Sequence, residues 1–82
     1  MKNRSRNEIV ADILSSLETP KSITSIMFDS YLSYGQLKTY CKMLLEKGLA
    51  EEKDGEWVST DKGRAYLRAY KEAAKIMEDA NI

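Results

Sequence analysis

Polar and cationic side chains recur at helical spacing between residues 34 and 47. They lie opposite the apolar positions Leu37, Cys41 and Leu44 and comprise Gly35, Gln36, Thr39, Lys42 and Glu46, with Lys38 at the flank. A glutamine amide can pair bidentately with adenine, a threonine can meet a thymine methyl, and lysines reach phosphates. This face therefore predicts DNA contact through Gln36, Lys38, Thr39 and Lys42. The alternative is an ordinary solvated helix face.

Groups that can hold a phosphate backbone stand on both sides of this segment. Ser33 and Tyr34 are at its N-terminus, where hydroxyls and free backbone N–H groups can bind a phosphate, although capping and packing are the alternative roles. Further backbone contacts are predicted from a basic N-terminal arm, a preceding helix and a hairpin: Lys2, Arg4, Arg6, Lys21, Thr24, Ser25, Lys53 and Gly55. The hairpin is the weakest candidate, because carboxylates surround Lys53 and repel phosphates.

The composition argues against catalysis and against a bound cofactor. One cysteine and no histidine exclude an intrachain disulfide, a zinc site of Cys and His ligands, and histidine-dependent acid–base chemistry. We therefore expect no enzyme, no metal, no cofactor and no small-molecule substrate. We interpret Cys41 as a buried small hydrophobe, with a redox switch as the alternative. Thirteen basic and 13 acidic residues balance, which counts modestly against nucleic-acid binding.

Serine caps and a proline predict three helices in the first part of the chain. The capping box Ser5–Glu8 begins the first helix, and Pro20 ends it because the residue before a proline is disfavoured in helical conformation. Ser22 caps a second helix that ends by residue 30, and Ser33 caps a third over residues 34–47. The apolar faces expected to form the core are Ile9, Val10, Ile13, Leu14 and Leu17, then Ile23, Ile26 and Met27, then Leu37, Tyr40, Cys41, Leu44 and Leu45.

A tight hairpin follows the third helix directly. Gly48 suits a left-handed helix cap, and Asp54-Gly55 is a two-residue turn between strands at 49–53 and 56–59. Thr60 or Asp61 then caps a last helix that runs close to the end of the chain. Three helices, a hairpin and a helix are the order of a winged helix-turn-helix domain, a mainly α fold with a small β-hairpin. In such domains the third helix enters the major groove and the hairpin is the wing.

Several short segments also carry a resemblance to a known family. They are Leu32-Ser33-Tyr34, Leu37, Tyr40, Leu44-Leu45, Glu46-Lys47-Gly48-Leu49 and Thr60-Asp61-Lys62-Gly63. Over roughly residues 8–70 the chain resembles small archaeal winged helix-turn-helix DNA-binding proteins, including those encoded by viruses and plasmids. The resemblance implies dimerisation through the final helix and a role as a transcription regulator or chromosome-associated protein. At Cys41 the chain departs from the larger aliphatic residue that is usual in the family.

Apolar and small residues recur at spacings of four and three along the last helix, which is typical of a coiled coil. We expect its early part to pack on its own domain and its later part to contact a second copy. The predicted dimer contacts are Tyr66, Tyr70, Ala73, Ile76, Met77 and Ala80. The chain is thus interpreted as a single domain, with a winged-helix DNA-binding part and basic arm at 1–62 and a dimerisation helix at 63–82. A helix folded back on its own core is the alternative.

These features together predict a homodimer that binds double-stranded DNA sequence-specifically and regulates transcription, as a repressor acting by occupancy. A protein-interaction module with the same fold and a non-specific architectural DNA-binding protein are the alternatives. Neither a membrane-spanning apolar run nor a signal-peptide core is visible, so we expect no membrane partner and a cytoplasmic location, in the host if the chain is viral.

Overall fold

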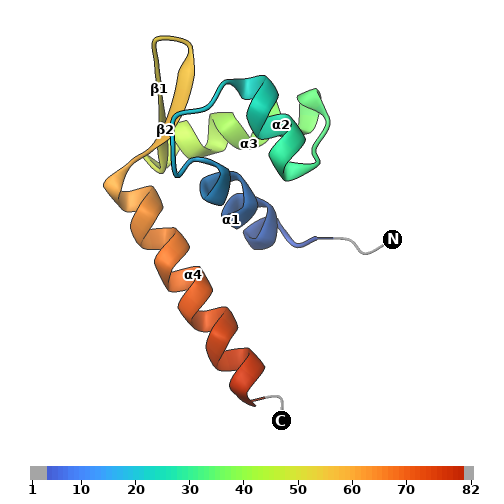
Figure 1. Cartoon of the computed structure of the whole chain (residues 1–82), viewed down its shortest axis with the longest axis vertical. Helices are drawn as coiled ribbons and strands as arrows, with labels where there is room; N and C mark the ends of the chain where they lie inside the picture. Colours follow the sequence, from blue (N-terminus) through green and yellow to red (C-terminus); the bar gives the residue numbers. More distant parts are fainter. Residues whose placement is uncertain (1–3, 81–82) are drawn as a thin grey trace.

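Four helices and one hairpin make up the chain in the computed structural model, which describes residues 4–80 and the side chains of residues 4–78. The elements are α1 (Arg6–Ser16), α2 (Ile23–Ser30), α3 (Tyr34–Glu46), β1 (Ala50–Lys53), β2 (Glu56–Ser59) and α4 (Asp61–Ala80). Helices α1 to α3 gather beside the hairpin, and α4 leads away from them (Figure 1). The predicted order of elements is confirmed.

The predicted helix caps are present. Ser5 and Ser33 each form a full capping box, and the Ser22 hydroxyl accepts a hydrogen bond from the backbone N–H of Ser25. Helix α1 ends at Ser16, earlier than the expected end at Pro20, and a turn fills the residues between them. Each start of a helix is therefore fixed by a local side-chain hydrogen bond that the sequence makes visible.

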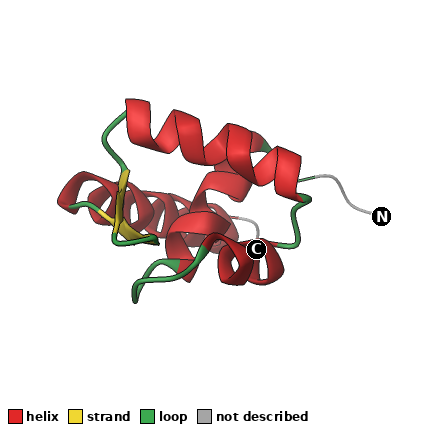
Figure 2. Cartoon of the chain, turned by 90° about the horizontal axis from the view of Figure 1, so that it is seen from above, coloured by secondary structure: helices red, strands yellow, loops and turns green. Residues whose placement is uncertain are grey.

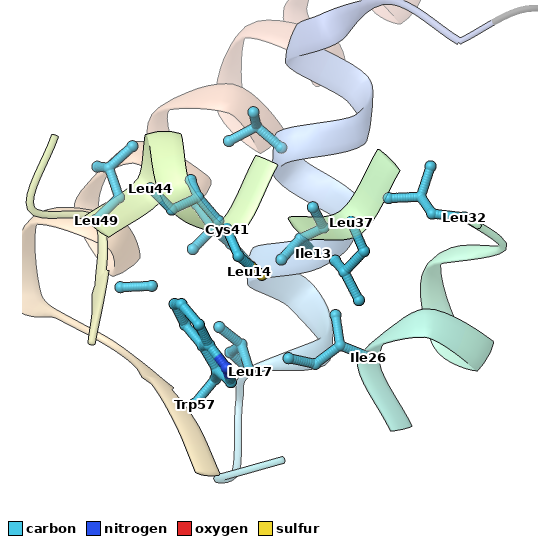
Figure 3. Packing of buried hydrophobic residues seen from close by; sticks show 12 residues of the cluster. Ile13, Leu14, Leu17, Ile26, Leu32, Leu37, Cys41, Leu44, Leu49 and Trp57 are labelled. Carbon is cyan, nitrogen blue, oxygen red and sulfur yellow. The ribbon is translucent and has the colours of Figure 1, made fainter. Parts of the chain in front are cut away.

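The core is formed by apolar side chains from α1, α2 and α3, closed on one side by Trp57 of β2 (Figure 3). Five of these side chains are almost completely buried: Ile13, Leu14, Ile26, Leu37 and Leu44. The expectation that Leu45 joins the core is wrong, because its side chain is 45% exposed. One residue past Leu44 is about 100° further around a helix, which carries Leu45 out of the covered arc.

The hairpin is as the sequence predicts, except that its first strand begins at Ala50, one residue later than expected. β1 and β2 are antiparallel, and both turn residues have positive φ, 53° at Asp54 and 80° at Gly55, as a type I′ turn requires. Lys21, which lies between α1 and α2, pairs with Trp57 through two backbone hydrogen bonds of 3.1 and 2.7 Å. The strands therefore lie at one side of the molecule, tied to the segment that leads into α2 (Figure 2).

Helix α4 has two parts with different surroundings. Its first part packs on α1, where the Tyr66 and Tyr70 rings stack at 6.5 Å and the Tyr66 hydroxyl donates to Asn7 at 3.4 Å. Partial burial there, with the charges of Glu8 and Asp12, raises the pKa of Tyr70. From residue 71 to residue 78 every side chain is exposed. None of the helices described combines the length and apolar character that a membrane span needs.

Candidate nucleic-acid interface

The outward face of α3 is formed by the polar residues that the sequence places there. Leu37, Cys41 and Leu44 are buried against the core, while the opposite side chains are exposed. This exposed set comprises Gln36, Lys38, Thr39 and Lys42, with Gly35 at its N-terminal end. Tyr31 is the C-cap of α2 and has a left-handed backbone conformation, with φ 56°. The chain turns there before it enters α3. The helix is therefore free to meet a large partner along this face.

Two of the predicted base-reading side chains also make hydrogen bonds within α3. The Gln36 Oε1 accepts from the Ser33 backbone N–H at 3.1 Å, and the Thr39 Oγ1 donates to the Gly35 carbonyl at 3.2 Å. The Thr39 methyl group needs no such partner and can meet a thymine methyl. A bidentate contact of Gln36 with adenine would use the same Oε1 that now accepts from Ser33.

Lys38 and Lys42 flank a shallow apolar depression on this surface. The Lys38 Nζ lies 5.6 Å from the centroid of the Tyr34 ring, within range of a cation–π interaction. The depression between the lysines is lined by Ile23, Cys41, Leu45 and Trp57. The sequence did not predict Leu45 at this surface, because its helical spacing is typical of a core position. The combination of two cations with an apolar floor suits the sugars and phosphates of a nucleic-acid strand.

The N-terminal ends of α2 and α3 present hydroxyl groups to solvent. The Ser33 hydroxyl accepts from the Gln36 N–H at 3.2 Å, so it has the capping role that was the alternative for this residue. Tyr34 is 54% exposed and Thr24 is exposed. The Ser25 side chain is exposed and accepts from the Ser22 hydroxyl at 3.2 Å. These groups stand where a phosphate can approach two helix N-termini.

Two of the cationic side chains predicted to contact the DNA backbone form ion pairs within the domain. The Arg4 guanidinium bonds Asp12 Oδ2 at 2.7 Å and the Tyr31 carbonyl at 3.4 Å. The Lys21 ammonium donates to the Ser16 carbonyl at 2.9 Å and to Asp29 Oδ2 at 3.1 Å.

The Asp29 carboxylate is in turn held by its neighbours. Hydrogen bonds from Ser16 and Lys21 hold the pKa of Asp29 below its usual value. A phosphate would therefore have to compete with Asp12 for Arg4 and with Asp29 for Lys21. Arg6 is exposed on α1 beside Lys47. Lys2 lies outside the described residues.

The hairpin has an acidic surface with one cation. Lys53 is exposed and its Nζ lies 3.8 Å from Glu51 Oε1. Gly55 forms the tip together with Asp54. Among residues 4–80 no group of three or more acidic, cysteine or histidine side chains is placed to hold a metal ion. The geometry thus concentrates the candidate DNA contacts on α3 and the start of α2 rather than on the hairpin.

The predicted dimer contacts lie along α4. Tyr66 and Tyr70 are partly covered by α1, whereas Ala73 is exposed and Ile76 and Met77 are 60% and 70% exposed. The side chain of Ala80 lies outside the described residues. The later part of α4 therefore presents apolar side chains that no described part of the protomer covers.

Comparison with known proteins was made for the sequence and for the fold. The family model described as "Winged helix-turn-helix" matches residues 3–81. A solved structure, "Sso10a-2, a DNA-binding protein from Sulfolobus solfataricus", is similar in fold, with a TM-score of 0.81 and 24% sequence identity over 95% of this chain and 86% of that chain. A search of curated protein sequences finds no match.

Proposed function

The chain belongs to the winged helix-turn-helix family, and we propose that it binds double-stranded DNA with α3 in the major groove. The observation that carries this proposal is the exposed face of α3, on which Gln36, Lys38, Thr39 and Lys42 all point to solvent. The similarity in fold to Sso10a-2, a DNA-binding protein, supports it.

The proposed DNA-binding unit is a homodimer joined through α4. Ile76 and Met77 are large apolar side chains that stay largely exposed among the described residues, and a second copy would remove them from water. Two antiparallel copies of α4 give a two-fold axis and present two α3 helices to one duplex. Half-sites about 34 Å apart would then place both helices in successive major grooves.

We propose sequence-specific binding by a regulator that represses through occupancy, acting in the cytoplasm where DNA is accessible. Gln36 and Thr39 support specificity because their side chains can address base edges. The balanced net charge argues only against non-specific binding as the alternative, because purely electrostatic binding depends on many unpaired cations. No catalytic step is part of this proposal.

A second candidate function is a protein-interaction module that does not use DNA. The acidic hairpin favours it, because the carboxylates around Lys53 oppose a phosphate backbone.

Selection of sites from random duplex DNA, followed by fluorescence-anisotropy titration at rising salt, tests the proposal. A palindromic preferred site bound more tightly than unrelated duplexes is the expected result. Equal affinity for all sequences with a steep salt slope would indicate architectural binding. An absence of binding at low salt would leave the interaction module.

A further inference from the structure

The C-terminal end of α3 and the N-terminal end of α4 meet at one corner of the domain. Helix α3 ends in a Schellman motif, with Gly48 at φ 72° and hydrogen bonds from Gly48 N–H to the Leu45 carbonyl (3.1 Å) and from Leu49 N–H to the Leu44 carbonyl (2.8 Å). The carbonyls of Lys47 and Gly48 take no part in these two hydrogen bonds. Both carbonyls accept hydrogen bonds from side chains at the start of α4.

The hydroxyl of Thr60 joins the two helix ends. Its Oγ1 donates to the Gly48 carbonyl at 2.6 Å and accepts from the Gly63 backbone N–H at 3.0 Å. A hydroxyl has one proton to donate and can accept at the same time, so both bonds form together. Thr60 is therefore the N-cap of α4, and the same Oγ1 atom also bonds to Gly48 at the C-terminal cap of α3.

Two further contacts hold the same corner. The Lys62 ammonium donates to the Lys47 carbonyl at 2.7 Å, which places a cation at the negative end of α3. Gly63 packs against the backbone carbonyl of Leu49, where a Cβ would collide. The Thr60 N–H also donates to the Leu49 carbonyl at 3.1 Å. We call Thr60, Lys62 and Gly63, with the carbonyls they contact, the α3–α4 junction.

We propose that the α3–α4 junction fixes the direction of α4 relative to α3 and thereby sets the half-site spacing that the dimer accepts on DNA. This inference rests on the proposed DNA binding and dimerisation. Helix α4 has 20 residues, which makes it about 30 Å long. A tilt of about 10° at its base would move its far end by about 5 Å, more than the roughly 3.4 Å between base pairs. Thr60 and Lys62 are thus positioning residues that act through the angle between two helices.

The test uses the full-length protein and two substitutions that remove the polar contacts. Thr60→Val removes the hydroxyl while keeping the side-chain shape, and Lys62→Met keeps the aliphatic stem without the ammonium. Thr60→Ser, which retains the hydroxyl, is the matched control. Each protein is titrated with duplexes whose two half-sites are separated by one base pair more or less, and with a single half-site.

The wild-type protein and Thr60→Ser are expected to prefer one spacing by about tenfold, because fitting another spacing requires DNA deformation. Thr60→Val/Lys62→Met is expected to accept neighbouring spacings almost equally, with its affinity for a single half-site unchanged. A loss of stability alone would weaken all duplexes alike. A double variant that keeps the wild-type spacing preference would overturn the inference.

A second measurement does not depend on DNA or on the dimer. Nitroxide labels at Thr39→Cys on α3 and Glu72→Cys on α4, in a Cys41→Ala background diluted with unlabelled protein, report the distance between the helices by double electron–electron resonance. One narrow distance is expected for the intact junction and a broadened one for Thr60→Val/Lys62→Met. Lys62→Met alone serves if the double variant does not fold. Equal widths would overturn the inference, even if the protein proves not to bind DNA.

Discussion

The side-chain amide oxygen of Gln36 accepts a hydrogen bond from the Ser33 backbone N–H at 3.1 Å, while the backbone N–H of Gln36 donates to the Ser33 hydroxyl at 3.2 Å. The side chain proposed to read a base thus also caps the helix that presents it. The two roles are separable, because capping uses only the carbonyl oxygen and adenine recognition also uses the amide NH₂ group.

Gln36→Glu is expected to separate these roles. A glutamate keeps the acceptor for Ser33 and favours the helix N-terminus, so the free energy of unfolding should be equal or higher by about 0.5 kcal/mol. The lost donor and the new charge should weaken binding to the preferred DNA site by about tenfold or more. Chemical denaturation and fluorescence anisotropy measure the two effects. Unchanged DNA affinity would assign Gln36 to capping alone.

Lys38→Ala and Lys42→Ala are expected to reduce the salt dependence of DNA binding. Each phosphate contact contributes about 0.9 to the slope of log K against log salt, so one substitution in both protomers of the proposed dimer should lower the slope by about 1.8. Lys71→Ala, an exposed lysine on α4, is the matched control and should leave the slope as it is. An equal slope in all four proteins would place the phosphate contacts elsewhere.

Ile76→Glu/Met77→Glu is expected to dissociate the proposed dimer without unfolding the protomer. Both side chains are exposed in the protomer, so the free energy of folding has little to lose. Burying an unpaired carboxylate at the proposed contact costs roughly 3 kcal/mol or more, which is at least about 100-fold in the dissociation constant. Sedimentation equilibrium measures this shift, with Lys75→Glu on the same helix as control. A dimer that survives both glutamates would exclude this face as the contact.

Gly63→Ala and Gly35→Ala are expected to change stability in opposite directions. A Cβ at Gly63 would collide with the Leu49 carbonyl and force the backbone to shift, which should cost about 2 kcal/mol or more. A Cβ at Gly35 meets no atom within 4 Å, and alanine in a helix should add about 0.5–1 kcal/mol. Thermal unfolding followed by circular dichroism compares the pair. Equal stability of Gly63→Ala and the wild-type protein would contradict the close approach of residue 63 to the Leu49 carbonyl.

Cys41 is expected to make stability fall at alkaline pH. Burial, with a smaller contribution from the Glu52 charge, raises the pKa of its thiol from 9.0 to about 11. Because the folded state holds this proton more tightly, the stabilisation is complete below pH 9.0 and is lost as pH rises to about 11.

A comparison with Cys41→Ala isolates this effect, since other titrating groups are common to both proteins. The advantage of the wild-type protein in free energy of unfolding should shrink between pH 9.0 and about 11. An advantage that stays constant across this range would show that the thiol titrates at its ordinary pKa. Alkylation of the folded protein at pH 8 should also be slow, since the thiolate is the reactive form.

The helix starts and the hairpin turn were predictable because their causes are local. Ser5, Ser22 and Ser33 bond to N–H groups three residues away, and Asp54-Gly55 supplies the two positive φ angles of its turn within itself. Such contacts depend on neighbours in the sequence and are read directly from it.

Contacts between distant segments were not predictable. Lys21 follows a proline and shows no strand pattern, yet it pairs with Trp57. Arg4 has the type and place of a free basic arm, but Asp12 and the Tyr31 carbonyl bind it. Leu45 has core spacing but is 45% exposed, because the described segments cover its side of α3 only in part. In each case the outcome depends on which segment packs there, and a one-dimensional pattern does not contain that information.

Trp57 pairs with Glu52 of β1 on one side and with Lys21 through an isolated bridge on the other, which leaves β1 as the outer strand of the two-stranded sheet. An unpaired strand edge is a template on which other chains can stack into insoluble fibrils. The charged side chains of Glu51, Glu52 and Lys53 line this edge and are exposed. The same charges that oppose a phosphate partner would make two such edges repel each other, which is one of the ways in which edge strands avoid pairing with other chains.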